Sequence, residues 1–109
     1  MQTVEDLIRE NKGTIIDVRT SGEFLGGHVV GSKNIPLHEI PSRIDELQEY
    51  AMPLIFCCAS GNRSGQAAYY LGQQGLDCHN GGSWLDVNYM KSLANEDEEA
   101  AWFSFWKTF

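Results

Sequence analysis

The sequence of 109 residues is long enough to bury one hydrophobic core but not two, so we expect a single domain. Its 42% hydrophobic and 21% charged residues are ordinary for a soluble globular protein, and no apolar run approaches the length of a membrane span. The formal net charge of −7 argues against nucleic acid and against anionic membranes as partners. Any attraction for a small anion must therefore be local to one part of the chain.

Cysteine usage indicates a reducing compartment. The three cysteines are too few for a disulfide scaffold, and Cys57 and Cys58 are adjacent, which would strain a disulfide between them. Their spacing to Cys78 fits no zinc motif. Residues 1–6 also lack the basic and then apolar pattern of a secretory signal. We therefore expect a cytoplasmic location, no metal or organic cofactor, and one working thiol.

Helix and strand signals alternate along the chain, which is typical of an α/β protein. In the first half we expect a helix capped by Thr3, a strand at 14–18, a helical turn opened by a capping box at 20–23, a short strand at 33–36 and a helix at 41–50. In the second half we expect a strand from Pro53, a helix from about residue 63 that ends before Gly75, a strand at 76–79, a sharp turn at 80–82 and a helix capped by Ser83. The apolar segment 14–18 predicts a strand that is covered on both faces.

The end of the chain has a different composition. Residues 95–99 form an acidic break, and the last ten residues contain five aromatic side chains. We expect residues 1–94 to form the domain, and residues 95–109 to form an acidic hinge with an aromatic tail of the same domain. The tail should dock on its own domain, across a homodimer or on a partner, so we expect a monomer or a homodimer. The docking stripe at helical spacing consists of Trp102, Phe105, Trp106 and Phe109.

The most informative stretch runs from Cys57 to Ser64, between the apolar run 54–56 and the helix-forming run 66–71. It predicts a buried strand, a tight loop and a helix that begins near Arg63. Such a loop directs unpaired backbone N–H groups inward, and these bind anions and favour a thiolate over a thiol. Gly61 permits dihedral angles that a Cβ would resist, and Arg63 adds a permanent positive charge.

Three blocks of the sequence resemble the rhodanese family of sulfurtransferases and together cover about residues 13–90. The loop block is the pattern Cys-x-x-Gly-x-Arg-Ser, which runs from Cys58. The other blocks are Ile16-Asp17-Val18-Arg19, Glu23-Phe24, Gly27-His28-Val29, Gly31-Ser32 and Asn34-Ile35-Pro36-Leu37 upstream, and Asn80-Gly81-Gly82 with Trp84 downstream. The resemblance implies an α/β rhodanese-like fold, with a central, mostly parallel sheet of about five short strands and helices on both faces.

Two registers of the loop imply different reactions. Four residues separate Cys58 from Arg63, as in the sulfurtransferase loop, whereas five separate Cys57 from Arg63, as in rhodanese-fold phosphatases and arsenate reductases. Gly61 stands three residues after Cys58, where the sulfurtransferase pattern has its glycine, and Phe56 precedes Cys57 where phosphatases commonly have histidine. We therefore expect Cys58 to be the nucleophile and Cys57 to be a buried, inert side chain.

The resemblance implies a thiosulfate sulfurtransferase-like enzyme. Cys58 would accept a sulfane sulfur from thiosulfate or a persulfide donor. It would then pass this sulfur to an acceptor thiol, and a protein thiol can be that acceptor. The alternatives are a phosphatase or arsenate reductase that uses Cys57, and a non-catalytic binding module. The donor would be bound by the loop residues Ala59, Ser60, Gly61, Asn62, Arg63 and Ser64, with Arg63 helping to hold the charge of the leaving group.

Three further residues are expected to support the loop: Asp17, Arg19 and Glu23. We expect Arg19 to form a structural ion pair with Glu23, and Asp17 to bond the loop amides or Arg63. His28 is expected to lie in a structural turn rather than act as a base, and Trp84 to lie in the core.

Overall fold

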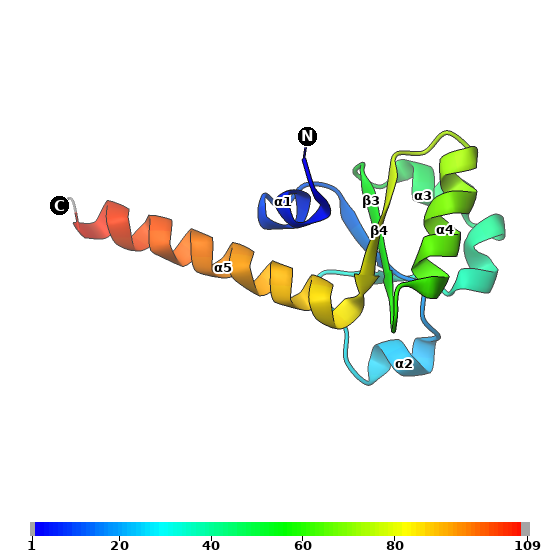
Figure 1. Cartoon of the computed structure of the whole chain (residues 1–109), viewed down its shortest axis with the longest axis horizontal. Coiled ribbons are helices and arrows are strands. Elements are labelled where there is room, and N and C mark those ends of the chain that lie inside the picture. The colour runs from blue at the N-terminus through cyan, green and yellow to red at the C-terminus, as the bar shows by residue number, and fades with distance from the viewer. Residues whose placement is uncertain (1, 108–109) are drawn as a thin grey trace.

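The computed structural model describes the backbone of residues 2–107 and the side chains of residues 2–96, 99 and 100. Short helices and strands alternate along the chain, and one long helix ends it (Figure 1). In chain order the elements are α1 (Val4–Arg9), β1 (Thr14–Asp17), α2 (Ser21–Leu25), β2 (Lys33–Asn34), the 3-10 helix η1 (Leu37–Ser42), α3 (Ile44–Glu49), β3 (Leu54–Cys58), α4 (Asn62–Gln73), β4 (Cys78–Ser83) and α5 (Trp84–Lys107).

Within the described part of the chain, four strands form one parallel sheet in the order β2-β1-β3-β4. The α/β class and the parallel sheet are as expected, with four strands rather than about five. Because the carboxyl ends of parallel strands lie at one edge of the sheet, Asp17, Cys58 and Ser83 come to the same edge. This edge is where ligands bind in open α/β sheets.

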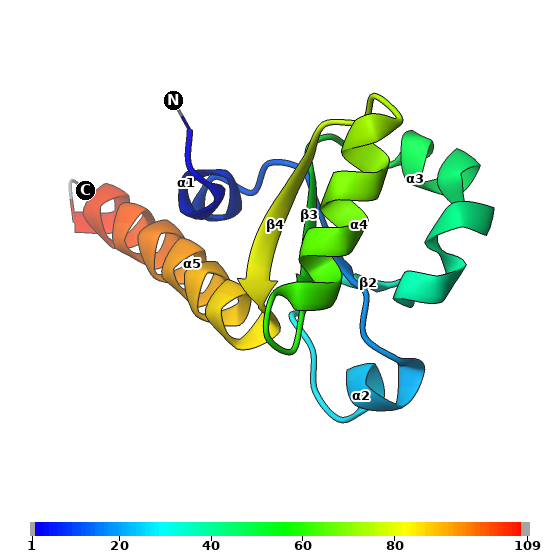
Figure 2. The same cartoon turned by 45° about the vertical axis from the view of Figure 1, so that its right-hand side comes forward.

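Helices cover both faces of the sheet. In Figures 1 and 2, α1 and α5 lie on one side of β3 and β4, and α3 and α4 lie on the other. The two layers of core follow the alternation of side chains along the strands. On the α3 and α4 side the core contains Leu54, Phe56 and Cys58 of β3 with Leu47 and Leu71. On the α1 and α5 side it contains Ile55 and Cys57 of β3 with Leu7, Ile8 and Val87.

The local capping signals are confirmed. Thr3 and Asp6 form a capping box at the start of α1, and Thr20 and Glu23 form another at the start of α2. Beyond the end of α4, Gly75 has a φ of +89°, a left-handed conformation that follows many helices. These ends need only residues close in sequence, which is why the sequence predicts them well.

The predicted helix at 41–50 is in two pieces. The chain forms η1 before it forms α3, and Arg43 separates the two with φ −122°. Pro41 therefore lies inside η1, which begins at Leu37, and does not open the α-helix as expected; α3 begins only after Arg43.

The predicted sharp turn at 80–82 is wrong. These residues continue β4, and the pairing with β3 shifts register there, so that Asn80 faces Phe56 while Gly82 faces Cys57. Gly81 is therefore the extra residue of a bulge. A Cβ on Gly81 would lie 3.0 Å from Cγ2 of both Ile55 and Val87, so the close packing of α5 on the sheet favours glycine.

The acidic segment 95–99 is helical rather than a break, because α5 continues through it. Three of its five residues are glutamate, which favours helices, and the segment contains no glycine or proline. The side chains of Trp102, Phe105, Trp106 and Phe109 lie outside the described residues, so the docking of the stripe and the division at residue 94 stay predictions. No helix in the described part of the chain has both the length and the apolar composition needed to cross a membrane.

The close packing at Gly81 leads to a stability prediction. Gly81→Ala should lower the free energy of unfolding by about 1–3 kcal/mol, because the new methyl group overpacks the contact between β3 and α5. Gly72→Ala is the matched control, since a Cβ there meets nothing within 4 Å and the site is inside α4. It should be neutral or stabilising by up to about 1 kcal/mol. Denaturant unfolding of both variants measures the difference, and equal stability would contradict the packing argument.

Candidate active site

The loop between β3 and α4 turns the chain at Gly61. This residue has φ +96°, in the left-handed region that favours glycine. A Cβ on Gly61 would also lie 3.3 Å from the Cα of Gly82 in the neighbouring strand. The turn brings the first amides of α4 back to the carboxyl end of β3, where Cys58 lies.

Hydrogen-bond donors surround the sulfur of Cys58. The backbone nitrogens of Gly61 and Ser64 lie 3.0 Å and 3.4 Å from Sγ, and the Ser64 hydroxyl oxygen lies 3.3 Å from it. The two amides belong to the start of α4, whose first N–H groups have no partner within the helix. The arrangement can stabilise negative charge on Cys58, or on a sulfur atom attached to it.

Asn80 completes this arrangement, and sequence reasoning missed it as a site residue. The Ser64 hydroxyl donates its one proton to Asn80 Oδ1 at 2.7 Å while Cys58 is a thiol, and can turn that proton to the sulfur when Cys58 ionises. The Gly82 amide donates to the same Asn80 oxygen at 3.0 Å. Asn80 Nδ2 donates to the carbonyl oxygen of Gly61 at 3.0 Å. Asn80 therefore ties the turn and the hydroxyl to β4. Asn80 stands beside two glycines in one of the motif blocks, which could have indicated its role in the site. A sharp turn, however, explains the same three residues equally well.

The pKa values of the two adjacent cysteines are shifted in opposite directions. Burial raises the pKa of the Cys58 thiol, but hydrogen bonds with the Ser64 hydroxyl and from the amides of Ser64, Gly61 and Ser60 outweigh burial and lower the pKa from its ordinary value. Burial raises the pKa of Cys57 to about 12, and the nearby charge of Asp17 adds to this. Of the two, Cys58 is therefore the thiol that ionises more readily.

The Cys58 side chain lies under the loop. Its exposed fraction is 0%, whereas Ala59, Ser60 and Asn62 are exposed. Among the predicted donor-binding residues, Gly61 and Ser64 thus lie against the sulfur, and the small residues Ala59, Ser60 and Asn62 lie on the surface. A reagent reaches Sγ only after the loop or the Cys58 side chain shifts.

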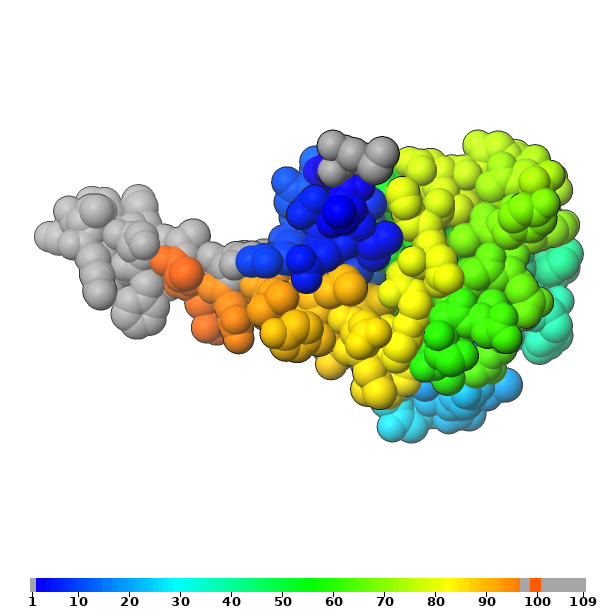
Figure 3. Space-filling model, in the orientation of Figure 1, coloured from blue at the N-terminus to red at the C-terminus, as the bar shows by residue number. Residues whose placement is uncertain are grey.

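Arg63 is bound by Glu23 across the mouth of the loop. Its Nη1 and Nη2 donate to Oε1 and Oε2 of Glu23 at 2.8 Å and 3.0 Å. Figure 3 shows α2, in light blue, lying against the surface where α4 begins. The prediction that Glu23 pairs with Arg19 is therefore wrong: the Glu23 carboxylate reaches the loop instead, and Arg19 contacts only the backbone oxygen of Glu23, at 3.3 Å.

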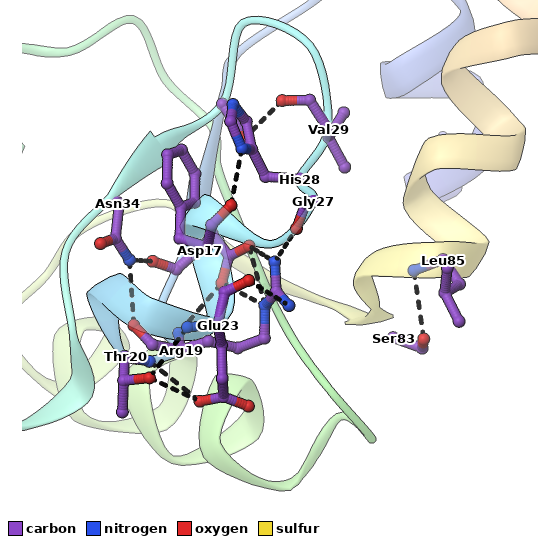
Figure 4. A network of polar contacts seen from close by, with 12 residues as sticks. Asp17, Arg19, Thr20, Glu23, Gly27, His28, Val29, Asn34, Ser83 and Leu85 are labelled. Carbon is purple, nitrogen blue, oxygen red and sulfur yellow. Dashed lines mark hydrogen bonds and ion pairs between the residues drawn. The ribbon is translucent and has the colours of Figure 1, made fainter.

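Asp17 binds Arg19 rather than the loop amides or Arg63, which corrects the second expected contact (Figure 4). Both side chains are buried, and the shortest distance between them is 2.7 Å, from Arg19 Nη2 to Asp17 Oδ2. Arg19 Nη2 also donates to the carbonyl oxygen of Gly27 at 2.7 Å, and the guanidinium carbon lies 4.6 Å from the centre of the half-buried Trp84 ring. The pair thus fixes α2 and the start of α5 to the end of β1.

His28 lies in a structural turn, as expected. Its Nδ1 is 2.8 Å from the carbonyl oxygen of Phe24, and its ring stacks on the Phe24 ring with the centres 3.7 Å apart. Among the side chains that the structure describes, no group of three His, Cys, Asp or Glu residues could hold a metal ion.

Comparison with known proteins assigns the family. The sequence model of the Rhodanese-like domain family matches residues 1–89. The uncharacterized protein YqhL of Bacillus subtilis is 41% identical over 64 residues, which are 59% of this chain and 50% of that protein. Thiosulfate sulfurtransferase GlpE of Pseudomonas aeruginosa is 37% identical over 69 residues, which are 63% of this chain and 62% of that protein. A crystal structure titled "rhodanese with anions from E. coli" superposes with a TM-score of 0.61 at 33% identity, covering 67% of this chain and 88% of that one.

The chain therefore belongs to the rhodanese-like domain family, whose named relatives include sulfurtransferases. It spans about half to three-fifths of the length of the curated relatives it matches first.

The donors around Cys58 lead to a pH prediction. Ser64→Ala removes the hydroxyl that can donate its proton to an ionised Cys58, so the pKa of Cys58 should rise and its thiolate fraction at neutral pH should fall. The measurement is the pH dependence of the rate at which iodoacetamide alkylates Cys58, located by peptide mapping. Its midpoint should move to higher pH in this variant. Ser60→Ala is the control, because it keeps the backbone N–H of residue 60, and equal midpoints in the two variants would contradict the assignment.

Proposed function

We propose that the protein is a sulfurtransferase that carries a sulfane sulfur on Cys58 as a persulfide. The observation that carries this proposal is the convergence of the Gly61 and Ser64 amides and the Ser64 hydroxyl on one sulfur atom. These neutral donors would stabilise the thiolate before transfer and the terminal sulfur of the persulfide after it.

The reaction would proceed in two steps with a covalent intermediate. The Cys58 thiolate attacks the outer sulfur of thiosulfate, a new S–S bond forms, and the old S–S bond breaks with its electron pair leaving on sulfite. Cys58 then carries an ionised persulfide. In the second step an acceptor thiolate, on a small molecule or a protein, attacks the outer sulfur and releases the Cys58 thiolate.

The loop surface would govern access to the sulfur. Cys58 has no exposed area, so donor binding must accompany a shift that uncovers Sγ. The exposed residues Ala59, Ser60 and Asn62 are small, and their backbone amides would contribute to donor binding. The names of GlpE as a thiosulfate sulfurtransferase and of the E. coli rhodanese with anions support an anionic donor.

Cys57 has properties that argue against a role as nucleophile. Its exposed fraction is 0%, it packs with Ile55 and Val87 on the opposite face of the sheet, and its pKa is about 12. A phosphatase or arsenate reductase that uses Cys57 would need a thiolate at that position. No observation favours this alternative.

The proposal is tested by loading the protein with sulfur. Incubation with thiosulfate should add the mass of one sulfur atom, and peptide mapping should place it on Cys58. Cys58→Ser should abolish both the loading and the transfer of sulfur to cyanide. Cys57→Ser should retain most of the activity, although a buried hydroxyl without a partner would lower stability by about 1–3 kcal/mol.

Two outcomes would reject the proposal. A folded wild-type protein that gains no sulfur from thiosulfate or from a persulfide would leave a binding module as the better reading. Hydrolysis of an aryl phosphate that survives in Cys58→Ser but not in Cys57→Ser would favour the phosphatase instead.

A further inference from the structure

Arg63 is the one charged side chain in the loop from Cys58 to Ser64. It therefore supplies whatever full positive charge the loop can offer to a donor. Both of its terminal nitrogens are engaged by the two Glu23 oxygens, at 2.8 Å and 3.0 Å. A bidentate pair of this geometry is among the strongest charge-assisted contacts that an arginine makes.

The Glu23 carboxylate is held in place by its own helix. The backbone nitrogen of Thr20 donates to Oε1 at 3.0 Å, and the Thr20 hydroxyl donates to the same oxygen at 3.1 Å. Arg19 holds the backbone oxygen of Glu23 and is itself bound to buried Asp17. The hydrogen bonds from Arg63 lower the pKa of Glu23 to about 2, so the carboxylate is ionised at every working pH. The pair is therefore neutral as a unit.

We propose that Glu23 is a specificity-determining residue: by neutralising Arg63 it directs the site toward sulfur donors that carry one negative charge, such as alkyl persulfides and thiosulfonates, over dianionic thiosulfate. This inference rests on the proposed sulfur transfer to Cys58. A dianion approaching the Cys58 thiolate meets neutral amides, a neutral ion pair and a chain of net charge −7. A donor with one charge fewer meets less repulsion.

Thiosulfate and methanethiosulfonate form a matched pair of donors for the test. In both, the Cys58 thiolate attacks a terminal sulfur and the bond from that sulfur to a sulfonyl group breaks. The electron pair leaves on sulfite, a dianion, in the first case and on methanesulfinate, a monoanion, in the second. The covalent change at Cys58 is identical, so the ratio of kcat/KM for the two donors reports chiefly the charge of the donor.

The decisive variant is Glu23→Gln. Glutamine keeps the side-chain length and can still accept from the Thr20 amide, because a capping box takes either residue. It leaves the Arg63 charge uncompensated. The kcat/KM ratio of thiosulfate to methanethiosulfonate, with cyanide as acceptor, should rise by about three- to tenfold, the effect of one charge acting across a partly solvated site. Added salt should diminish this rise.

Glu46→Gln is the matched control. Glu46 also pairs with an arginine, since its Oε2 lies 2.9 Å from Arg43 Nη2, and its replacement changes the net charge by the same amount. It lies on α3, at the end of the sheet away from the Cys58 loop (Figure 1). The donor ratio of this variant should equal that of the wild type.

Arg63→Gln tests the reverse change of charge, because it leaves the negative charge of Glu23 without a partner. The donor ratio should fall by about three- to tenfold, and the double variant Glu23→Gln/Arg63→Gln should return near the wild-type ratio. Both donors are measured on one preparation, so the folded fraction cancels from each ratio.

The outcomes separate the two proposals. If the wild type loads sulfur on Cys58 but neither Glu23→Gln nor Arg63→Gln changes the ratio more than Glu46→Gln does, Glu23 has no role in specificity and the sulfurtransferase assignment stands. If the wild type accepts sulfur from neither donor, both proposals fail.

Discussion

The buried Asp17–Arg19 ion pair joins the elements that surround the cysteine loop. Asp17 ends β1 and has an exposed side-chain fraction of 0%, against 5% for Arg19. Removing two charges from water costs several kcal/mol for each ion, and good geometry with additional hydrogen bonds is needed to offset that cost. Arg19 has both, through its contacts with Asp17 and with the carbonyl oxygens of Glu23 and Gly27. The position of α2, and hence of the Glu23 carboxylate, depends on this pair.

The pleat of β3 separates two neighbouring cysteines into different environments. Successive side chains of a strand point to opposite faces, so Cys58 lies on the α4 side and Cys57 on the α1 and α5 side. Cys58 ends the strand and meets the first amides of α4, while Cys57 meets apolar side chains and the charge of Asp17. Burial thus keeps the Cys57 thiol protonated, whereas hydrogen bonds favour ionisation of Cys58, one residue further along the chain.

Negative charge on the Cys58 sulfur would be stabilised by dipoles rather than by a free cation. The donors nearest the Cys58 sulfur are two backbone amides and a hydroxyl, and the guanidinium of Arg63 is occupied by Glu23. Dipoles act over a short range, so they hold a charge that is already in place but attract a distant anion weakly. In a chain of net charge −7, this arrangement separates stabilisation of the sulfur from attraction of the donor.

The sequence by itself determined the features that depend on neighbouring residues. The capping boxes at Thr3 and Thr20 need partners three residues away, and the position of Gly61 relative to Cys58 identifies the loop register. The order of strands and helices followed from the same local patterns, so the α/β class could be predicted, and the resemblance to the rhodanese family implied the parallel sheet.

Only the tertiary structure decided which distant groups meet at the site. Glu23 and Arg63 are 40 residues apart, and Ser64 and Asn80 are 16 apart, so no local pattern selects either contact. Asp17 and Glu23 are both within four residues of Arg19, so the sequence does not decide between them. The placement of α2 directs the Glu23 carboxylate away from Arg19, which pairs with Asp17. The glycines at 80–82 likewise suit a turn or a bulge, and the packing of α5 on the sheet selects the bulge. The packing of helices on the sheet fixes the direction in which each side chain points, and this direction determines which side chains meet. It is set only once the chain has folded.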